Sequence, residues 1–184
     1  MTGPTANHLE GQKSPYLKQH AYQLVDWWPM TEEAIAHARS LNRVIFLSIG
    51  YSTCHWCHVM AHESFDDPET ADFLNKNFVC IKIDREEFPD IDRYYQEACQ
   101  LFTQSGGWPL SAFLLPDLRP FFVGTYFPKH RGHNLPSFLD VAQELARAIK
   151  DDEKLIHENA QKVVEAILNG LLPKDKIKFQ GHFP

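Results

Sequence analysis

The chain has little cysteine, no long apolar run and no excess of positive charge. Only four of its 184 residues are cysteines, too few for a disulfide-built scaffold, and a chain of this length can bury a core without one. No apolar run approaches the roughly 20 residues that a membrane-spanning helix needs. The net charge of −6 argues against a broad nucleic-acid surface, which requires a basic face. We therefore expect one globular domain without a membrane or nucleic-acid partner.

The sequence also lacks a visible secretory signal. Residues 1–20 contain neither an apolar core nor a small-residue cleavage site, and we expect a cytoplasmic protein. In that compartment a pair of cysteines two residues apart is more often catalytic or metal-binding than structural. The two remaining cysteines, Cys80 and Cys99, are predicted to lie in the core as small hydrophobic residues.

The segment STCHWCHVM carries the strongest chemical signal in the chain. Cys54 and Cys57 could form a redox dithiol, could attach a c-type haem with His58 as axial ligand, or could bind zinc together with His58 and His62. Haem needs a second axial ligand and attachment machinery, and neither is indicated. Structural zinc sites usually take ligands from two separated segments, and only one is present here. A dithiol is favoured, with an inert buried pair as the alternative.

The residues around the motif explain this preference. VIFLSIGY, residues 44–51, is an apolar run typical of a strand buried on both faces, and residues 54–64 are predicted to be helical. Cys54 then lies where a helix begins, and the free backbone N–H groups and helix dipole there favour its thiolate. Cys57 lies nearly one turn inside the helix and is predicted to be the resolving thiol.

Three neighbours of the cysteines are predicted to adjust the reactivity of the dithiol. His55, when protonated, would stabilise the thiolate, and Trp56 would shield one side of the pair. His58 follows directly on the same helix. No organic cofactor and no metal is required for this chemistry.

The remaining pattern predicts an α/β fold with a mixed sheet of four strands or more. Two buried strands separated by helices should be parallel, and two apolar runs joined by PDLRP should form an antiparallel hairpin beside them. Asp92 is expected to cap the helix that begins at Pro89. The predicted helices are 31–41, 67–77, 89–104 and 136–169 with a break near 151–152, and the other predicted strands are 79–86, 110–115 and 120–127.

The segment SGGWP is predicted to form the second part of the site. An aromatic residue before a proline raises the odds of a cis bond, and Trp108-Pro109 opens the first strand of the hairpin. Gly107 would allow close approach of a substrate backbone, while Trp108 and Pro109 would hold an extended substrate by strand addition. An ordinary loop proline is the alternative.

Several blocks together resemble a known family. The segments KSPYLKQHAY, SIGYSTCHWCHVM, KIDREEFPDID and SGGWPLSAFLLPDLRPFFVGTYFP are similar to the N-terminal thioredoxin-like domain of the DUF255 family, which includes spermatogenesis-associated protein 20. The resemblance implies a thioredoxin-like fold, Cys54 and Cys57 as the redox pair, and Pro109 as the cis-proline. Full-length members also carry a C-terminal domain similar to (α/α)6-barrel sugar-processing enzymes.

The chain departs from ordinary thioredoxins at its site. His-Trp replaces Gly-Pro between the cysteines, which changes the redox poise. Ser48 stands six residues before Cys54, where thioredoxins have a buried carboxylate, so the proton acceptor for the resolving thiol is missing or supplied elsewhere. His58 and Glu63 are candidates for it. Phe88 stands where the family often has arginine, which affects only a surface ion pair.

These expectations define the domains and the function to be tested. Residues 1–26 should form an irregular arm whose aromatic residues supply packing area, 27–169 the thioredoxin-like domain, and 170–184 a linker or frayed tail. The expected function is thiol–disulfide oxidoreduction on a disulfide-containing protein or small thiol. The alternative is a non-catalytic docking module for a partner or for the C-terminal domain of the full-length protein.

Overall fold

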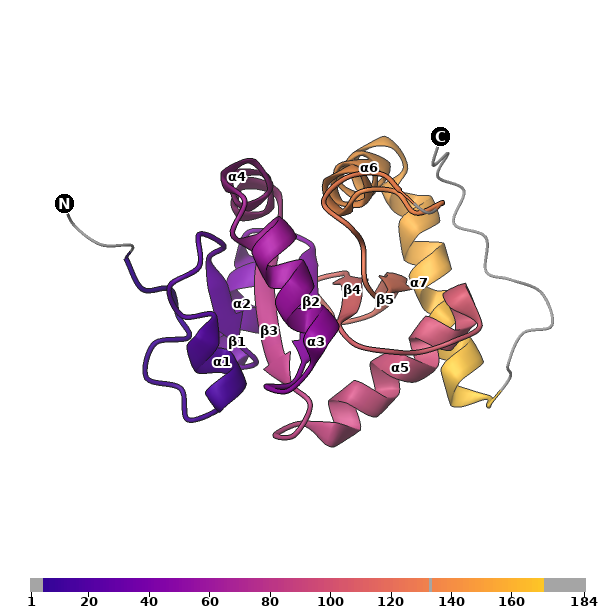
Figure 1. The fold of residues 1–184 in the computed structure, drawn as a ribbon. Coiled ribbons are helices and arrows are strands. Elements are labelled where there is room, and N and C mark those ends of the chain that lie inside the picture. The colour runs from indigo at the N-terminus through magenta and orange to yellow at the C-terminus, as the bar shows by residue number, and fades with distance from the viewer. Residues whose placement is uncertain (1–4, 133, 171–184) are drawn as a thin grey trace.

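The computed structural model describes residues 5–132 and 134–170, so nearly all of the expected tail lies outside the described residues. One mixed sheet of five strands, in the order β1-β3-β2-β4-β5, runs through the molecule (Figure 1). The strands are β1 (Trp27–Pro29), β2 (Ile45–Gly50), β3 (Val79–Asp84), β4 (Leu110–Leu114) and β5 (Pro120–Gly124).

The pairing of the strands is the one expected from the sequence, with one addition. β2 and β3 are parallel, β4 is antiparallel to β2, and β4 and β5 form the predicted hairpin. The addition is β1, which pairs in parallel with β3 through only three residues. Its sequence, WWP, is too short to show an alternation of apolar and polar residues. The fold is α/β with a mixed sheet, as predicted.

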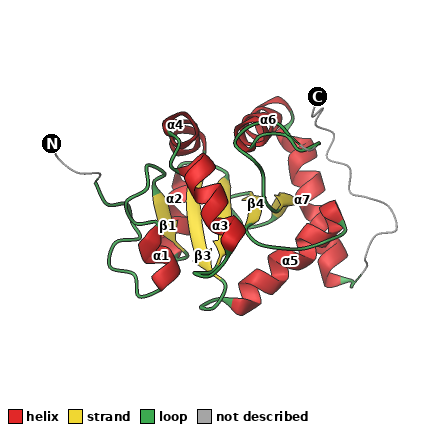
Figure 2. Cartoon of the chain, viewed as in Figure 1, coloured by secondary structure: helices red, strands yellow, loops and turns green. Residues whose placement is uncertain are grey.

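Helices cover both faces of the sheet (Figure 2). Residues of α1, α3, η1, α4 and α6 pack in one core cluster, residues of α2 and α5 pack in the other, and α7 contributes to both. Among the described residues, no helix is long and apolar enough to cross a membrane. The helical elements are α1 (Pro15–Gln19), α2 (Glu32–Ser40), α3 (His55–Met60), the π-helical segment η1 (Ala61–Phe65), α4 (Pro68–Asn77), α5 (Pro89–Thr103), α6 (Phe138–Asp151) and α7 (Glu153–Leu168).

Most helices begin at a side chain that caps the first turn. Thr31 and Asp67 accept hydrogen bonds from backbone N–H groups in the first turns of α2 and α4. Asp152 ends α6 and caps α7, which is the predicted break. The expectation for Asp92 is wrong, because Phe88 is at the N-cap of α5 without a side-chain bond and Asp92 points into the structure instead.

The arm before β1 contains one short helix, α1, and packs on the same side of the sheet as α3 and α4. Tyr16 and Leu17 of α1 are almost fully buried, whereas Tyr22 is 56% exposed. The expectation that the aromatic residues of the arm supply packing area is therefore wrong for Tyr22. Because Tyr16 is packed against the core, its hydroxyl group lies inside the domain, where it needs polar neighbours.

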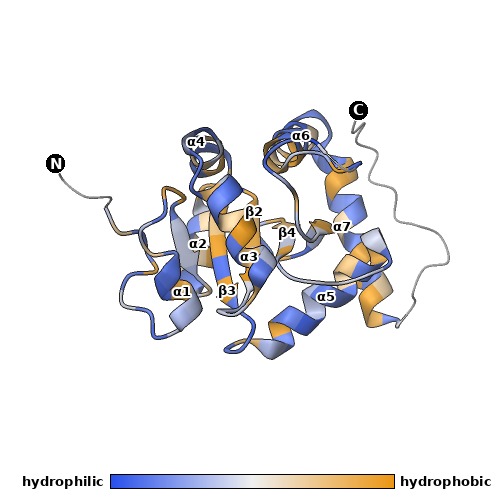
Figure 3. Cartoon of the chain, in the orientation of Figure 1, coloured by the Kyte–Doolittle hydropathy of each residue, from blue (hydrophilic) through white to orange (hydrophobic). Residues whose placement is uncertain are grey.

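Side chains alternate along each strand, and this decides which of them lie on the sheet face covered by α1 and α3. In β2, Phe46 belongs to the first core cluster, while Ile45, Leu47 and Ile49 belong to the second. Ser48 and Gly50 share the parity of Phe46, so they lie on the face covered by α1 and α3. Figure 3 shows the apolar sheet between helices whose outer sides are largely hydrophilic. Polar groups on this inner face are therefore removed from water.

Candidate active site

The two motif cysteines lie where β2 passes into α3. Cys54 is the N-cap of α3, and its sulfur accepts a hydrogen bond from the backbone N–H of Cys57 over 3.2 Å. The two residues form a disulfide, with their Cα atoms 5.3 Å apart. This is the placement that the sequence predicts for Cys54, and it directs the free N–H groups of a helix start toward that sulfur.

The disulfide is covered, while the two residues between the cysteines are exposed. Cys54 is 4% exposed and Cys57 2% exposed, whereas Trp56 is 52% exposed. The Trp56 ring contacts His55 and also Tyr126, with ring centroids 5.4 and 4.9 Å away. The large exposed ring of Trp56 therefore lies beside the covered disulfide.

The histidines that suggested haem or zinc are engaged with other partners. The Nε2–H group of His58 donates a 2.7 Å hydrogen bond to the carbonyl oxygen of Ser52. His62 is exposed and pairs with Asp66 at 3.0 Å. Within residues 5–132 and 134–170, no group of three or more His, Cys, Asp or Glu side chains is arranged to hold a metal ion.

The second segment, before β4, reaches the same edge of the sheet. Leu110 pairs with Ile49 in antiparallel β2 and β4. Pro109, directly before Leu110, therefore lies at the end where β2 leads into the motif. The Trp108-Pro109 bond is cis, and Pro109 is buried while Trp108 is partly exposed. The Trp108 ring contacts that of Tyr51, with centroids 5.9 Å apart. The sheet therefore brings the two predicted segments together.

Helix α5 fixes this loop through two side chains. Gln96 forms two 3.0 Å hydrogen bonds with Gly107, accepting from its N–H and donating to its carbonyl oxygen. The indole N–H of Trp108 donates to Asp92 over 2.9 Å. A side chain at Gly106 would displace the amide oxygen of Gln96, which accepts the Gly107 N–H bond. Both side chains belong to α5, so this helix fixes the backbone at Gly107 and the indole ring of Trp108.

Arg85 completes the support of Trp108. Its guanidinium group lies 4.1 Å from the centre of the Trp108 ring and 5.5 Å from that of Tyr51. Its Nε is 3.7 Å from Asp92. Sequence reasoning missed these roles, because Arg85 and Asp92 look like members of an ordinary charge cluster at a helix start.

A buried row of polar groups lies beneath the disulfide. Ser48 of β2 and Lys82 of β3 are directly paired, and Lys82 Nζ donates to Ser48 Oγ over 3.1 Å. Both residues are almost completely buried. Burial lowers the pKa of Lys82 to about 7 from its ordinary value of 10.5. A lysine with this pKa can gain or lose a proton near neutral pH.

Tyr16 connects this row to the cysteines. A Cβ atom at Gly50 would overlap with the Tyr16 hydroxyl oxygen and would lie 2.7 Å from the Cys57 sulfur, so both atoms border the same small space. A hydrogen bond with Ser48 lowers the pKa of Tyr16, but burial raises it by more, so the hydroxyl stays protonated. The sequence held one signal for this row, a single lysine inside the apolar strand VCIKI.

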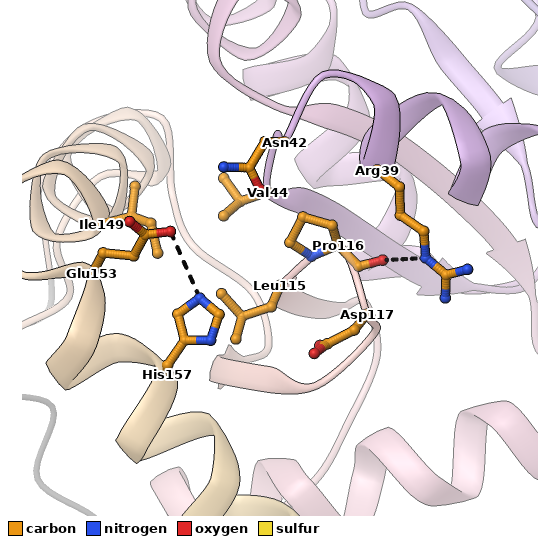
Figure 4. Close-up of a pocket in the computed structure, with 9 residues that line it drawn as sticks. All are labelled: Arg39, Asn42, Val44, Leu115, Pro116, Asp117, Ile149, Glu153 and His157. Carbon is orange, nitrogen blue, oxygen red and sulfur yellow. Dashed lines mark hydrogen bonds and ion pairs between the residues drawn. The ribbon is translucent and has the colours of Figure 1, made fainter.

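A pocket of about 340 Å³ lies at the other end of the central strands, where β2 begins and β4 ends (Figure 4). Its walls come from the ends of α2, β4 and α6 and from the start of α7, with Arg39, Asp117 and His157 among the polar side chains. His157 lies 3.8 Å from Glu153, and Arg39 donates to the carbonyl oxygen of Pro116. No cysteine lines this pocket, so it is separate from the dithiol.

Comparisons with known proteins agree on family and fold. The family named Thioredox_DsbH and described as "Protein of unknown function, DUF255" matches residues 6–168. Spermatogenesis-associated protein 20 from Mus musculus is 46% identical over 164 residues, which are 89% of this chain and 21% of that protein. An uncharacterised protein, B0495.5, from Caenorhabditis elegans is 43% identical over 167 residues, 91% of this chain and 23% of that protein. The chain thus spans about a fifth of the length of these relatives.

Two solved structures share the fold. One named "DsbH Oxidoreductase" has a TM-score of 0.51 at 15% identity, covering 68% of this chain and 85% of the other. A thioredoxin from Thermus thermophilus has a TM-score of 0.51 at 20% identity, covering 71% of this chain and 95% of the other. At these identities the likeness concerns the fold, and the chemistry has to be argued from the residues themselves.

Proposed function

The chain belongs to the DUF255 family, and from this premise we propose that it is a thiol–disulfide oxidoreductase with Cys54 and Cys57 as its redox pair. The observation that carries the proposal is the disulfide at the start of α3, where the first sulfur accepts a backbone N–H bond. A thiolate at that position is stabilised by the same groups after reduction.

The reaction proceeds by two exchange steps in the reductive direction. The Cys54 thiolate attacks one sulfur of a substrate disulfide, forms a mixed disulfide and releases the first substrate thiolate. Cys57, as thiolate, then attacks Cys54 sulfur, restores the internal disulfide and releases the second substrate thiolate. Two electrons pass from the dithiol to the substrate. An external dithiol then reduces the pair for the next turnover.

The substrate is held by the loop before β4 and by the aromatic rings of Trp56 and Tyr126 beside the dithiol. We assign Trp108, Pro109 and Gly107 to substrate binding, because a loop fixed by Asp92 and Gln96 offers its outer side to an extended peptide. His55, Trp56 and His58 surround the dithiol on α3 and adjust its reactivity. The exposed ring of Trp56 favours substrates with an apolar residue beside the disulfide.

The test is disulfide reduction by the reduced protein. Insulin reduction with a dithiol as electron source should be catalytic in the wild type and lost in Cys54→Ser. Cys57→Ser should stop after the mixed disulfide, which accumulates and can be trapped. Cys99→Ser is the matched control, because Cys99 is buried away from the motif and should leave turnover intact. Equal activity of the wild type and Cys54→Ser would refute the proposal.

A docking function is the second candidate, and the length of the relatives favours it. The chain spans 21% of spermatogenesis-associated protein 20, so full-length members have further segments on which such a domain could pack. A domain similar to sugar-processing enzymes is the partner we expect. If the reduced chain turns over no disulfide but binds the remainder of a full-length relative, the docking function replaces the catalytic one.

A further inference from the structure

The resolving step requires a group that takes the proton of Cys57. Cys57 is only 2% exposed, so water has little access to its sulfur. Ser48 occupies the strand position where thioredoxins carry a carboxylate. The two substitutes suggested by the sequence are engaged elsewhere, since His58 donates to Ser52 and Glu63 accepts a 2.7 Å hydrogen bond from Tyr126.

The geometry offers another acceptor behind the disulfide. Lys82 Nζ is 3.1 Å from Ser48 Oγ, and the Ser48 side chain interacts with the Tyr16 hydroxyl. That hydroxyl and the Cys57 sulfur both border the space where Gly50 has no side chain. Two hydroxyl groups, each able to accept one proton and donate another, therefore lie between the buried amine and the resolving sulfur.

The surroundings of Lys82 make it a proton-exchanging group rather than a fixed charge. Its ammonium position lies 4.2 Å from the ring centre of Trp27 and 4.6 Å from that of Phe65, with Tyr16 at 5.4 Å. No carboxylate forms an ion pair with it in the described part of the chain.

Besides Tyr16, three titratable groups interact electrostatically with Lys82. Asp66, after η1, and Cys80, on β3, raise its pKa, while burial lowers it by more. His20, after α1, is itself buried, and Lys82 helps to keep its pKa low. Lys82 therefore has no partner that would hold it permanently charged, and burial favours its neutral form.

We propose that Lys82 is the proton acceptor for Cys57 and that Tyr16 and Ser48 relay the proton. As the mixed disulfide resolves, the Cys57 thiol gives its proton to Tyr16, Tyr16 passes its own to Ser48, and Ser48 passes its own to the neutral Lys82 amine. Cys57 thiolate then attacks Cys54 sulfur and breaks its bond to the substrate sulfur. When an external dithiol reduces the disulfide, the ammonium returns the proton along the same path.

This inference rests on the proposed oxidoreductase function, and a two-phase experiment separates the two. Fully reduced protein is mixed with dithiobis(nitrobenzoate), a symmetric aromatic disulfide. Attack by Cys54 releases a first coloured thiolate at a rate that rises with probe concentration. Attack by Cys57 on the mixed disulfide releases a second coloured thiolate, at a rate that does not depend on probe concentration. Cys57→Ser should retain only the first phase, which identifies the second.

The decisive variant is Lys82→Met, which keeps the length of the side chain and removes the amine. We expect the second phase to slow by about a hundredfold at neutral pH while the first changes less than about twofold. Lys76→Met, on the surface of α4, is the matched control and should leave both phases unchanged. Ser48→Ala and Tyr16→Phe break the relay but keep Lys82, and should slow the second phase as well.

The pH profile distinguishes proton transfer from a packing defect. In the wild type the rate of the second phase should rise through a pKa near 7 and then level off, following Lys82. In Lys82→Met it should keep rising toward about pH 8.5, the pKa of an ordinary thiol. A second phase with the wild-type rate and profile in Lys82→Met overturns the inference and leaves the oxidoreductase function standing. A wild type without any second phase overturns both.

Discussion

The indole nitrogen of Trp108 lies 2.9 Å from a carboxylate oxygen of Asp92, a buried residue on α5. The same carboxylate faces Arg85, whose guanidinium group lies over the Trp108 ring. A single acidic side chain therefore holds the edge of the tryptophan before β4 directly and its face through Arg85. The loop is positioned by the helix directly before it in the chain, which contributes no residue to the exchange itself.

Asp92→Ala should loosen this loop. Trp108 and Arg85 would lose a buried acceptor, and a lost bond to a charged group costs about 1.5–3 kcal/mol. We expect KM for a protein disulfide to rise about tenfold and kcat to fall by less, because the dithiol is untouched. Steady-state reduction kinetics measure the split between KM and kcat, and urea unfolding measures the change in stability.

Asp90→Ala is the matched control for this prediction. Asp90 is on the same helix, but its side chain is 94% exposed, and its ion pair with Arg93 is long, at 4.0 Å. Such an exposed pair contributes little, so its removal should change neither kinetics nor stability appreciably. If Asp92→Ala lost stability but kept KM at the wild-type value, the loop would not depend on Asp92 for substrate binding.

The sequence predicts the two segments of the site but not the residues that support them. Cys54 and Pro109 are found where a strand ends or begins, and strand ends can be recognised from apolar runs and proline. Arg85 and Asp92 act across the fold, and a charge cluster before a helix has the same local pattern whether it caps the helix or holds a loop. Their roles depend on tertiary contacts that no local period encodes.

Gly50→Ala tests the packing between the arm and the dithiol. The added methyl group would collide with the Tyr16 hydroxyl and the Cys57 sulfur, both buried and without room to move. We expect a loss of about 1–3 kcal/mol in the free energy of unfolding of the oxidised protein. Gly132→Ala is the control, since a methyl group there meets only one backbone oxygen at 3.9 Å. Equal stabilities for the two variants would show that Tyr16 does not pack against Cys57.

Lys82 and Tyr16 show the same limit of sequence reasoning on the inner face. VCIKID is recognisable as a buried strand, and its lysine shares parity with Cys80, which places both on one face. The partner that reaches Lys82 comes from the arm, far earlier in the chain. An irregular segment has no period from which the position of Tyr16 could be predicted, so the arm could be described only as packing area.

The burial of Lys82 predicts a pH-dependent stability. Its pKa is about 7 in the folded protein and about 10.5 unfolded, so the unfolded chain binds more protons between these values and the folded state becomes more stable as pH rises through them. Below pH 7 both states carry the charge, and the cost of burying it is complete. Lys82→Met should therefore raise the free energy of unfolding by a few kcal/mol at pH 6, and the gain should shrink toward pH 10.

Urea unfolding of the wild type and Lys82→Met across this range measures the difference directly. Lys76→Met, at an exposed position, should follow the wild type at every pH. A gain that stays constant from pH 6 to pH 10 would mean that Lys82 keeps its charge in the fold throughout. The proton acceptance proposed above would then lose its physical basis.

The burial of His20 predicts a second pH dependence of stability, at acidic pH. It is buried against Tyr16, its Nε2 has no hydrogen-bond partner among the described residues, and burial with nearby Lys82 lowers its pKa to about 2. The unfolded chain therefore binds the extra proton as pH falls below about 6.5, and stability should drop by about 2–3 kcal/mol by pH 4.5. His20→Phe keeps a flat ring there and should remove this part of the acid sensitivity, whereas His130→Phe, at an exposed site, should not. Parallel acid unfolding curves for the wild type and His20→Phe would show that His20 becomes protonated without unfolding the arm.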